Sequence, residues 1–275
     1  MAGSRGGVGG QTRDTIDALP RPCVAVVVPC YNEADRLDVD GFDLLARSGL
    51  ASLLFVDDGS TDSTRAVLEK LAGELPSVTV LPLGSNRGKA EAVRQGMRHA
   101  VERGASVVGY YDADLATPPS ELARLVRTLC ADPALNGVLG SRVARLGSCI
   151  DRRAVRHYTG RVFATAASLA LGVAVYDTQC GAKIFRVNPQ LVAALERPFR
   201  SSWSFDVLLL QRLFDGDRTH AGLSPDTFVE VPLDAWFDVP GSKVRVGPGL
   251  VALLDVVRMG VTRRLAPRHV VGPRQ

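Results

Sequence analysis

Pairs of carboxylates follow apolar runs in the first half of the chain, and one pair has the spacing of a cation site. Asp112 and Asp114 come directly after the apolar run Val107–Tyr111. Two carboxylates at this spacing can reach one hard cation, and Mg²⁺ and Mn²⁺ commonly bridge such oxygens to substrate phosphates. The pair therefore predicts a divalent-metal site, with a solvated turn as the alternative.

Two further acidic clusters have the chemistry to hold a nucleotide. Asp57 and Asp58 follow the apolar run Ser52–Val56, and Glu33 follows Val24–Val28 in the sequence PCYNE. A carboxylate at a strand end can accept hydrogen bonds from a base N–H or from ribose hydroxyls. The alternative for each cluster is a turn that ends a strand or caps a helix.

A basic residue at a helix start could face a diphosphate. Asn86-Arg87-Gly88-Lys89 precedes an amphipathic pattern that runs to Arg103. Gly88 permits close backbone approach, and the N-terminal amides of a helix favour anions. The nucleotide-binding pattern GxxxxGK[ST] is absent from the sequence, so this is a different kind of phosphate contact.

Alternating strands and helices must position these groups. Strands are predicted at Val24–Val28, Ser52–Val56, Val78–Leu83, Ser106–Tyr111 and Gly137–Gly140, and helices at Asp62–Leu75, Lys89–Arg103 and Pro118–Cys130. This alternation predicts an α/β fold with a mostly parallel sheet flanked by helices, and ligands on such sheets bind outside the carboxyl ends of the strands. The clusters above all lie at those ends.

The second half of the chain has a less regular pattern. It predicts helices at Arg152–Leu171, Ser204–Phe214 and Gly249–Leu265, a strand at Thr227–Val231 and a polar loop at Asp177–Phe185. The organisation expected is a flexible N-terminal tail over 1–22, one catalytic domain over 23–247, and a basic amphipathic helix with its tail over 248–275.

Composition excludes several classes of protein. The chain has 275 residues, 46% apolar and 23% charged, which is ordinary globular composition rather than that of a disordered or fibrous chain. Five cysteines without a CxxC pair favour a reducing compartment over a disulfide framework. The first 22 residues lack the apolar core of a signal peptide, and the longest nearly uncharged stretch, Val162–Tyr176, is shorter than the roughly 20 residues of a membrane span. A cytoplasmic location is therefore expected.

Charge is unevenly distributed along the chain. The net charge is +4, which does not argue for nucleic acid. Residues 142–161 hold six arginines against one aspartate, residues 239–275 hold seven basic residues against one aspartate, and the remainder sums to −7. The C-terminal basic island could contact an anionic membrane surface at its cytoplasmic face, or it could serve only solubility and the helix dipole.

Eight motifs in order give a family resemblance. They are VVVPCYNEADRL, FVDDGSTDST, NRGKAEAVRQGM, YYDADLATPP, GSR, DTQCGAKIF, WSFDV and PGSKVRV. Together they resemble the family-2 glycosyltransferases of the GT-A (Rossmann-like) fold. Within that family, the sequence is most similar to the dolichyl- and polyprenyl-phosphate sugar synthases, in particular the dolichyl-phosphate β-glucosyltransferase branch.

The resemblance implies roles for individual residues. Asp112 and Asp114 match the metal-binding DxD motif, which implies Mg²⁺ or Mn²⁺ as cofactor. The positions that match the donor site are Pro29, Tyr31, Glu33, Asp57, Asp58, Lys89, Asp112, Gln179, Ser242 and Lys243. The positions that match the reaction centre and the acceptor phosphate are Arg142, Lys183 and Asp206, with Arg153 and Arg156 as further basic candidates.

The sequence departs from the pattern of that branch in three respects. Leu208 stands where FDV is usually followed by glutamate, so Asp206 lacks an acidic partner. Ala182 stands where phenylalanine is common, and the hydrophobic anchors of many relatives are absent. Ala182 implies an altered pocket, and Leu208 with the missing anchors favours a soluble hydroxyl acceptor over a lipid phosphate.

The function expected is inverting transfer of a hexose from a nucleotide sugar, in first place glucose from UDP-glucose, to a polyprenyl phosphate. A phosphate with a second pKa of about 6 is already largely dianionic at neutral pH and hardly needs a base. A soluble hydroxyl acceptor is the alternative, and it would need Asp206 as base. The remote alternative is a nucleotide-sugar-binding protein without catalysis.

Overall fold

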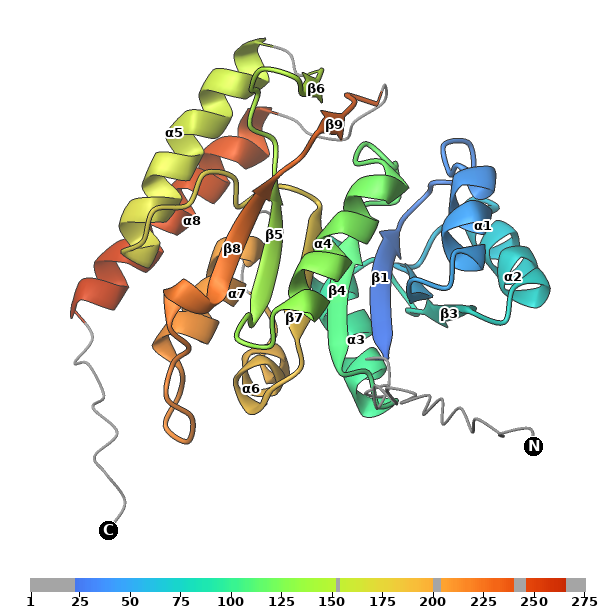
Figure 1. Cartoon of the computed structure of the whole chain (residues 1–275), viewed down its shortest axis with the longest axis horizontal. Coiled ribbons are helices and arrows are strands. Elements are labelled where there is room, and N and C mark those ends of the chain that lie inside the picture. The colour runs from blue at the N-terminus through green and yellow to red at the C-terminus, as the bar shows by residue number, and fades with distance from the viewer. Residues whose placement is uncertain (1–22, 152–153, 200–203, 240–245, 266–275) are drawn as a thin grey trace, which may run out of the picture.

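A computed structural model describes residues 23–151, 154–199, 204–239 and 246–265; the side chains of 154–157, 246–250 and 263–265 are not described. A seven-stranded sheet forms the centre of the molecule (Figure 1), in the order β3-β2-β1-β4-β7-β5-β8. The strands are β1 Val24–Cys30, β2 Ser52–Asp57, β3 Val78–Pro82, β4 Val107–Tyr111, β5 Gly137–Ser141, β7 Ala182–Arg186 and β8 Phe228–Pro232.

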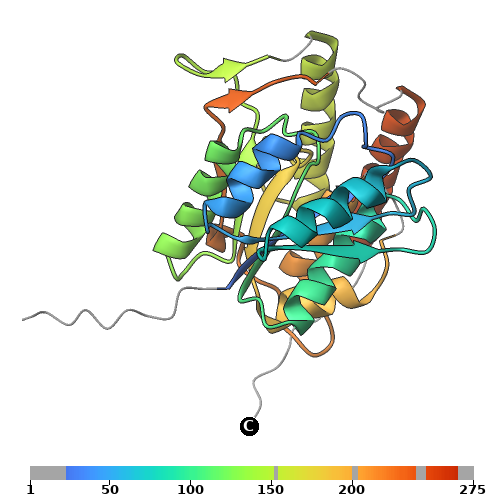
Figure 2. The same ribbon diagram turned by 90° about the vertical axis from the view of Figure 1, so that its right-hand side faces the viewer.

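The sheet is parallel except for one central strand. β7 runs antiparallel to both of its neighbours, β4 and β5. Two short strands, β6 (Cys149–Ile150) and β9 (Ala235–Trp236), form a separate parallel ribbon. That ribbon lies at the top of the molecule in Figures 1 and 2, beyond the ends at which the parallel strands of the main sheet finish.

Helices cover both faces of the sheet because its strands are buried on both sides. On one face, Val26 and Val28 pack in a core with α1 (Val39–Arg47), α2 (Thr64–Glu74) and α4 (Pro119–Ala131). On the other, Ala25 and Val27 pack in a core with the remaining helices, which are α3 (Lys89–Glu102), α5 (Ala154–Leu171), α6 (Pro189–Glu196), α7 (Phe205–Asp215) and α8 (Val246–Leu265). This arrangement confirms the predicted α/β class and its single domain.

The structure corrects one predicted segment and adds others. The polar stretch Asp177–Phe185 is a loop only in its first part, because residues from Ala182 onward form β7. Each residue of β7 from Ala182 to Phe185 is buried, since the strand has a partner on both edges and helices on both faces. The sequence patterns also gave no prediction for α1, α6, β6 or β9.

Among the described helices, none has both the length and the apolar character that crossing a bilayer requires.

Candidate active site

The three acidic clusters meet at one edge of the sheet. Cys30, at the end of β1, is in register with Asp57, at the end of β2. The next residue, Asp58, donates its backbone N–H to the carbonyl of Cys30 at 2.8 Å. Asp112 follows β4, which pairs with the other side of β1. The carboxyl ends of three adjacent strands therefore bring together groups that lie far apart in the chain.

Asn32 links the turn after β1 to the turn after β2. Its side-chain oxygen accepts the N–H of Thr61 at 2.8 Å, and its own N–H donates to Ser60 Oγ at 3.0 Å. Asn32 adopts a φ of 50°, a left-handed conformation that asparagine tolerates better than most residues. The N–H of Glu33 donates in turn to Thr64 Oγ1 at 2.8 Å. None of these fastening residues except Glu33 was singled out from the sequence.

Glu33 and Asp57 lie on these fastened turns with little exposure. Glu33 is 9% exposed and its carboxylate accepts two hydrogen bonds from Arg36, at 2.5 and 2.9 Å. Asp57 is 3% exposed and accepts the N–H of Ser60 at 3.0 Å. Pro29 and Tyr31, predicted with them, are partly buried in the same segment.

Asp58 has a structural task. Its two oxygens accept the backbone N–H groups of Arg87 and Gly88, both at 2.8 Å. Burial raises the pKa of Asp58, and these two hydrogen bonds oppose the shift only in part. Gly88 has a φ of 88°, which favours glycine, and α3 begins directly after it. Asp58 thus positions the start of α3 and with it Lys89.

Lys89 faces the predicted metal pair. Its Nζ lies 2.5 Å from Asp112 Oδ1, and the lysine side chain is 43% exposed. Desolvation acts to lower the pKa of Lys89, but the carboxylates of Asp112, Asp206 and Asp114 outweigh it and the net shift is upward. A cation at this point of the sheet edge can serve the phosphates of a nucleotide.

Asp112 and Asp114 have the chemistry of a divalent-cation site. Burial raises the pKa of Asp114, and repulsion from Asp112 adds to the shift, so a cation between them would relieve both costs. Asp114 accepts the N–H of Ala116 at 3.1 Å, which leaves its second oxygen for a ligand. No third His, Cys, Asp or Glu joins them in the described part of the chain. Two carboxylates suit Mg²⁺ or Mn²⁺, which completes its shell with phosphate oxygens and water.

The backbone of Gly181 packs directly against Asp112. Its N–H donates to the carbonyl of Gly181 at 3.0 Å. A Cβ at Gly181 would lie 2.0 Å from Asp112 Oδ2. The glycine of the DTQCGAK motif therefore lets the loop before β7 lie directly against the metal pair.

A buried ion pair lies behind this loop. Lys183 Nζ is 3.0 Å from Asp206 Oδ1 and also donates to the carbonyl of Cys180, while Tyr110 donates its hydroxyl to Asp206. The exposures of Lys183 and Asp206 are 1% and 6%. Burial lowers the pKa of Lys183 to about 8 and raises that of Asp206 to about 8. Tyr110, on β4, was not singled out from the sequence.

Arg142 forms a second buried pair at the end of β5. Its Nε and Nη2 donate to the two carboxylate oxygens of Asp177 at 2.7 and 2.8 Å, and the guanidinium lies 5.4 Å from the centre of the Trp236 ring. Desolvation opposes the charge of Arg142, but Asp177 more than offsets it, and the pKa shifts upward. Glu230 on β8 fixes the loop by accepting the N–H of Asp177 at 2.7 Å. Sequence reasoning missed both acids; Asp177 had a signal in its motif and Glu230 had none.

Three polar atoms near the Arg142–Asp177 pair have no hydrogen-bond partner among the residues that the structure describes. They are Ser141 Oγ, Thr178 Oγ1 and Gln179 Nε2, all buried. Buried polar groups are normally satisfied, so three such atoms around one ion pair make this a candidate place for a polar ligand. Of the three, Gln179 alone had been assigned to the donor from the sequence motifs.

Four predicted residues have no described side chain. Ser242, Lys243 and Arg153 lie outside the described residues, and Arg156 is on α5 but its side chain is not described. The other predicted side chains form two neighbouring groups. One group, which we call the acidic edge, comprises Glu33, Asp57, Asp58, Asp112 and Asp114 together with Lys89. The other comprises Arg142, Gln179, Lys183 and Asp206 around the loop that precedes β7.

Comparison with known proteins gives three findings. Residues 25–189 match the sequence profile described as Glycosyl transferase family 2. The chain is 33% identical over 190 residues to an undecaprenyl-phosphate 4-deoxy-4-formamido-L-arabinose transferase of Pseudomonas fluorescens, covering 65% of this chain and 52% of that protein, so it spans about half the length of that relative. It is 28% identical over 260 residues to the polyprenol monophosphomannose synthase of Mycolicibacterium smegmatis, covering 93% and 94% of the two chains.

The fold is also similar to solved structures. Glucosyl-3-phosphoglycerate synthase from Mycobacterium tuberculosis, in complex with Mn²⁺, UDP and glucosyl-3-phosphoglycerate, superposes with a TM-score of 0.63 at 21% identity, over 92% of this chain and 84% of that one. The shared architecture is the GT-A fold expected from the motifs.

Proposed function

The chain belongs to glycosyl transferase family 2, and from this premise we propose that it transfers a hexose from a nucleotide sugar to a polyprenyl phosphate. The observation that carries the proposal is the edge at which Asp112, Asp114 and Lys89 face one another, with Arg142 on the neighbouring loop. It offers a site for a diphosphate beside a site for a second anion.

The donor half is assigned to the acidic edge. Glu33 and Asp57 hold the base and ribose, and Lys89 contacts the diphosphate. Asp112 and Asp114 hold Mg²⁺ or Mn²⁺, which when bound neutralises the charge that develops on the departing nucleoside diphosphate. Asp58 acts through the backbone of the loop before Lys89. Support for a metal and for UDP comes from the complex of the M. tuberculosis enzyme.

The acceptor half is assigned to the loop before β7. Arg142 pairs with Asp177 through Nε and Nη2, so its Nη1 remains to meet a phosphate oxygen. The buried polar atoms of Ser141 and Thr178 lie beside the two members of this pair in the sequence. An acceptor phosphate attacks the anomeric carbon from the face opposite the leaving group, which gives inversion, and it needs no base because it is already dianionic.

The state of Asp206 supports a phosphate acceptor over a hydroxyl. A general base must reach the proton that it removes. Asp206 is 6% exposed, and its Oδ1 contacts both Lys183 and Tyr110, so this oxygen is engaged by neighbours within the protein. The curated relatives named for undecaprenyl phosphate and polyprenol add support for a lipid phosphate.

Glucose from UDP-glucose is the proposed donor because the motifs are most similar to the dolichyl-phosphate β-glucosyltransferase branch. A relative that spans nearly the whole chain is a mannose synthase, so mannose is the rival sugar. A panel of UDP- and GDP-sugars with one short prenyl phosphate decides between them. Release of UDP from UDP-glucose should exceed release of GDP from GDP-mannose at least tenfold, and the reverse order would contradict the assignment.

The same assay tests the acceptor and the metal. Transfer to a short prenyl phosphate should be lost in EDTA and restored by Mg²⁺ or Mn²⁺. Full activity in EDTA would contradict the metal site. A soluble hydroxyl acceptor is the second candidate, because the superposed M. tuberculosis enzyme is named for such an acceptor. Transfer to 3-phosphoglycerate or another soluble alcohol, without transfer to the prenyl phosphate, would favour it.

A further inference from the structure

Exposed apolar side chains are concentrated on one pair of helices. Of the twelve large hydrophobic residues that are exposed in the described part of the chain, seven lie on α5 and α8. We call them the α5–α8 face: Tyr158, Val162, Leu169, Val251, Leu254, Val257 and Val261. Each is between 50% and 70% exposed, and their spacing of three, four or seven residues places them along one side of each helix.

The hydrophobic core contains the other sides of these two helices, and not the α5–α8 face. The opposite sides of the two helices are buried, with Ala167 and Val256 both fully covered. The helices approach closely, because a Cβ at Gly260 would lie 3.1 Å from Ala170 Cα. The outer side of each helix therefore carries large apolar side chains beside exposed polar ones such as Thr165 and Thr262. Large apolar side chains gathered on an exposed surface mark an interaction site.

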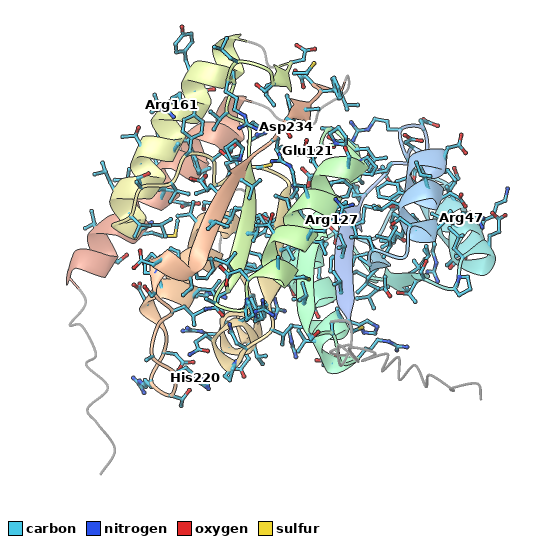
Figure 3. The ribbon with its side chains drawn as sticks, in the orientation of Figure 1. Arg47, Glu121, Arg127, Arg161, His220 and Asp234 are labelled. Atoms are coloured by element: carbon cyan, nitrogen blue, oxygen red, sulfur yellow. The ribbon has the colours of Figure 1, made fainter. Side chains whose placement is uncertain are left out.

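The charge of the two helices indicates what covers the face. Their sequences contain five arginines and only Asp255 as an acid. Arg258 on α8 is exposed, as is Arg161, which is labelled on α5 in Figure 3 and stacks over the ring of Tyr176 at 4.2 Å. Cations among exposed apolar side chains match an anionic lipid surface. A symmetric second copy would instead bring two cationic faces together.

The position of the face connects it to the site. α5 is the next element after β6 and begins near the β6–β9 ribbon, and α8 packs along α5 (Figures 1 and 2). Leu146 and Phe237, next to that ribbon, are exposed as well. β9 includes Trp236, whose ring lies against Arg142, so the ribbon near the start of α5 also borders the acceptor loop.

We propose that the α5–α8 face lies in the plane of an anionic bilayer and delivers the acceptor phosphate to Arg142 from that surface. The proposal rests on the proposed lipid-phosphate acceptor. It requires no spanning segment, because helices of this kind bury one side at the headgroup boundary. The lipid headgroups contribute charge, and the apolar side chains contribute the area removed from water.

Vesicle sedimentation of the full chain tests it, with phosphatidylcholine vesicles compared with vesicles that also contain phosphatidylglycerol. Binding should be strong only with the anionic lipid. The double variant Leu169→Gln with Leu254→Gln should lower the partition coefficient about tenfold or more, since two apolar contacts are lost. Leu44→Gln is the matched control, because Leu44 is 69% exposed on α1 and should change nothing. The double variant Arg161→Gln with Arg258→Gln should reduce the preference for anionic vesicles.

Two results would overturn the proposal. One is wild-type sedimentation that is no greater with anionic vesicles than without vesicles. The other is a dimer in analytical ultracentrifugation that the Leu169→Gln/Leu254→Gln variant dissociates, which would assign the face to a second copy. Transfer to a short, water-soluble prenyl phosphate without vesicles is measured in parallel and should be unchanged in the face variants. If that transfer is present and vesicle binding is absent, this surface is wrong and the proposed function stands; if transfer is absent, the proposed function itself fails.

Discussion

Among single residues, the buried pair of Lys183 and Asp206 has the most direct bearing on the reaction. Both groups are almost fully covered, and Tyr110 binds the same carboxylate. Two charges taken out of water gain little net free energy from each other, but removal of one leaves the other unpaired in the interior. The pair is therefore suited to hold β7 and α7 in place behind the metal loop.

Replacement of Asp206 separates a structural role from a catalytic one. Asp206→Asn should reduce kcat/KM with a prenyl phosphate only a few-fold, because a phosphate acceptor needs no base. The free energy of unfolding should fall by about 3 kcal/mol, because Lys183 loses its partner. Steady-state kinetics and urea unfolding measure the two effects on the same preparation.

A double replacement serves as the control. Lys183→Met with Asp206→Leu removes both charges and should recover most of the lost stability, as observed when buried ion pairs are replaced by apolar groups. A loss of hundreds-fold in kcat/KM for Asp206→Asn at unchanged stability would contradict the structural role and favour a hydroxyl acceptor.

Lys89 and a divalent cation compete for the same carboxylate. Lys89 Nζ lies 2.5 Å from Asp112 Oδ1. Lys89→Met should therefore tighten Mn²⁺ binding in the presence of UDP several-fold, because the repulsion from the ammonium is gone. The KM for the nucleotide sugar should rise about tenfold, because a charge-assisted contact to the diphosphate is lost.

Calorimetric titration of Mn²⁺ with UDP present measures the first effect. Lys70→Met, on the exposed side of α2, is the control and should leave both quantities unchanged. Weaker Mn²⁺ binding in Lys89→Met would show that Lys89 supports the metal site rather than competing with it.

At the scale of elements, the loop before β7 depends on one glycine. A Cβ at Gly181 would lie 2.0 Å from Asp112 Oδ2, so Gly181→Ala must displace either the loop or the carboxylate. Activity should fall at least a hundredfold while the fold persists, because the displacement is confined to the metal pair. Gly73→Ala is the control: a Cβ at Gly73, inside α2, meets nothing within 4 Å, and the change should stabilise the protein by about 0.5 to 1 kcal/mol. Circular dichroism and transfer rates report the two outcomes, and full activity of Gly181→Ala would contradict this packing.

Local sequence patterns predicted the strands whose burial follows from their own residues. β1, β2 and β4 were found because each is a continuous apolar run that ends in polar residues. β7 was missed because its sequence, AKIFR, begins after a polar loop and carries Lys183, whose burial depends on Asp206 on a later helix. The fastening role of Asn32 is set by turns on another strand, so no spacing within its own motif could reveal it.

The contact between α8 and α5 likewise depends on a small residue. A Cβ at Gly260 would lie 3.1 Å from Ala170 Cα, so the larger side chain of Gly260→Val should push α8 away from α5. Limited proteolysis should then cleave α8 faster than in the wild type, while donor binding by the acidic edge is retained. Gly73→Val is the matched control for valine in a helix, and equal proteolysis of α8 in both variants would contradict the packing of this pair.

For the whole molecule, the order of the strands determines how the chain can fold. The first five strands do not form a continuous sheet by themselves, because β7 lies between β4 and β5 and pairs with both. β8, later still in the sequence, extends the sheet beyond β5. Both halves of the chain thus contribute strands to one sheet, and the site lies where they meet: Asp112 from the first half contacts Gly181 from the second.

This interleaving predicts that the chain unfolds as one unit despite its length. Without β7, one edge of β4 and one edge of β5 would be unpaired. The helices α5 and α7 pack in the same core as these strands, so the loss of β7 would also disturb that core. Differential scanning calorimetry should therefore show one transition, with the calorimetric enthalpy close to the van't Hoff enthalpy. A fragment that ends at residue 151 keeps the donor carboxylates but should fail to fold or bind UDP, because it lacks β7 and the Gly181 backbone that holds Asp112. Two resolved transitions, or a folded fragment that binds UDP, would show instead that the donor half is an independent unit to which the acceptor half was added.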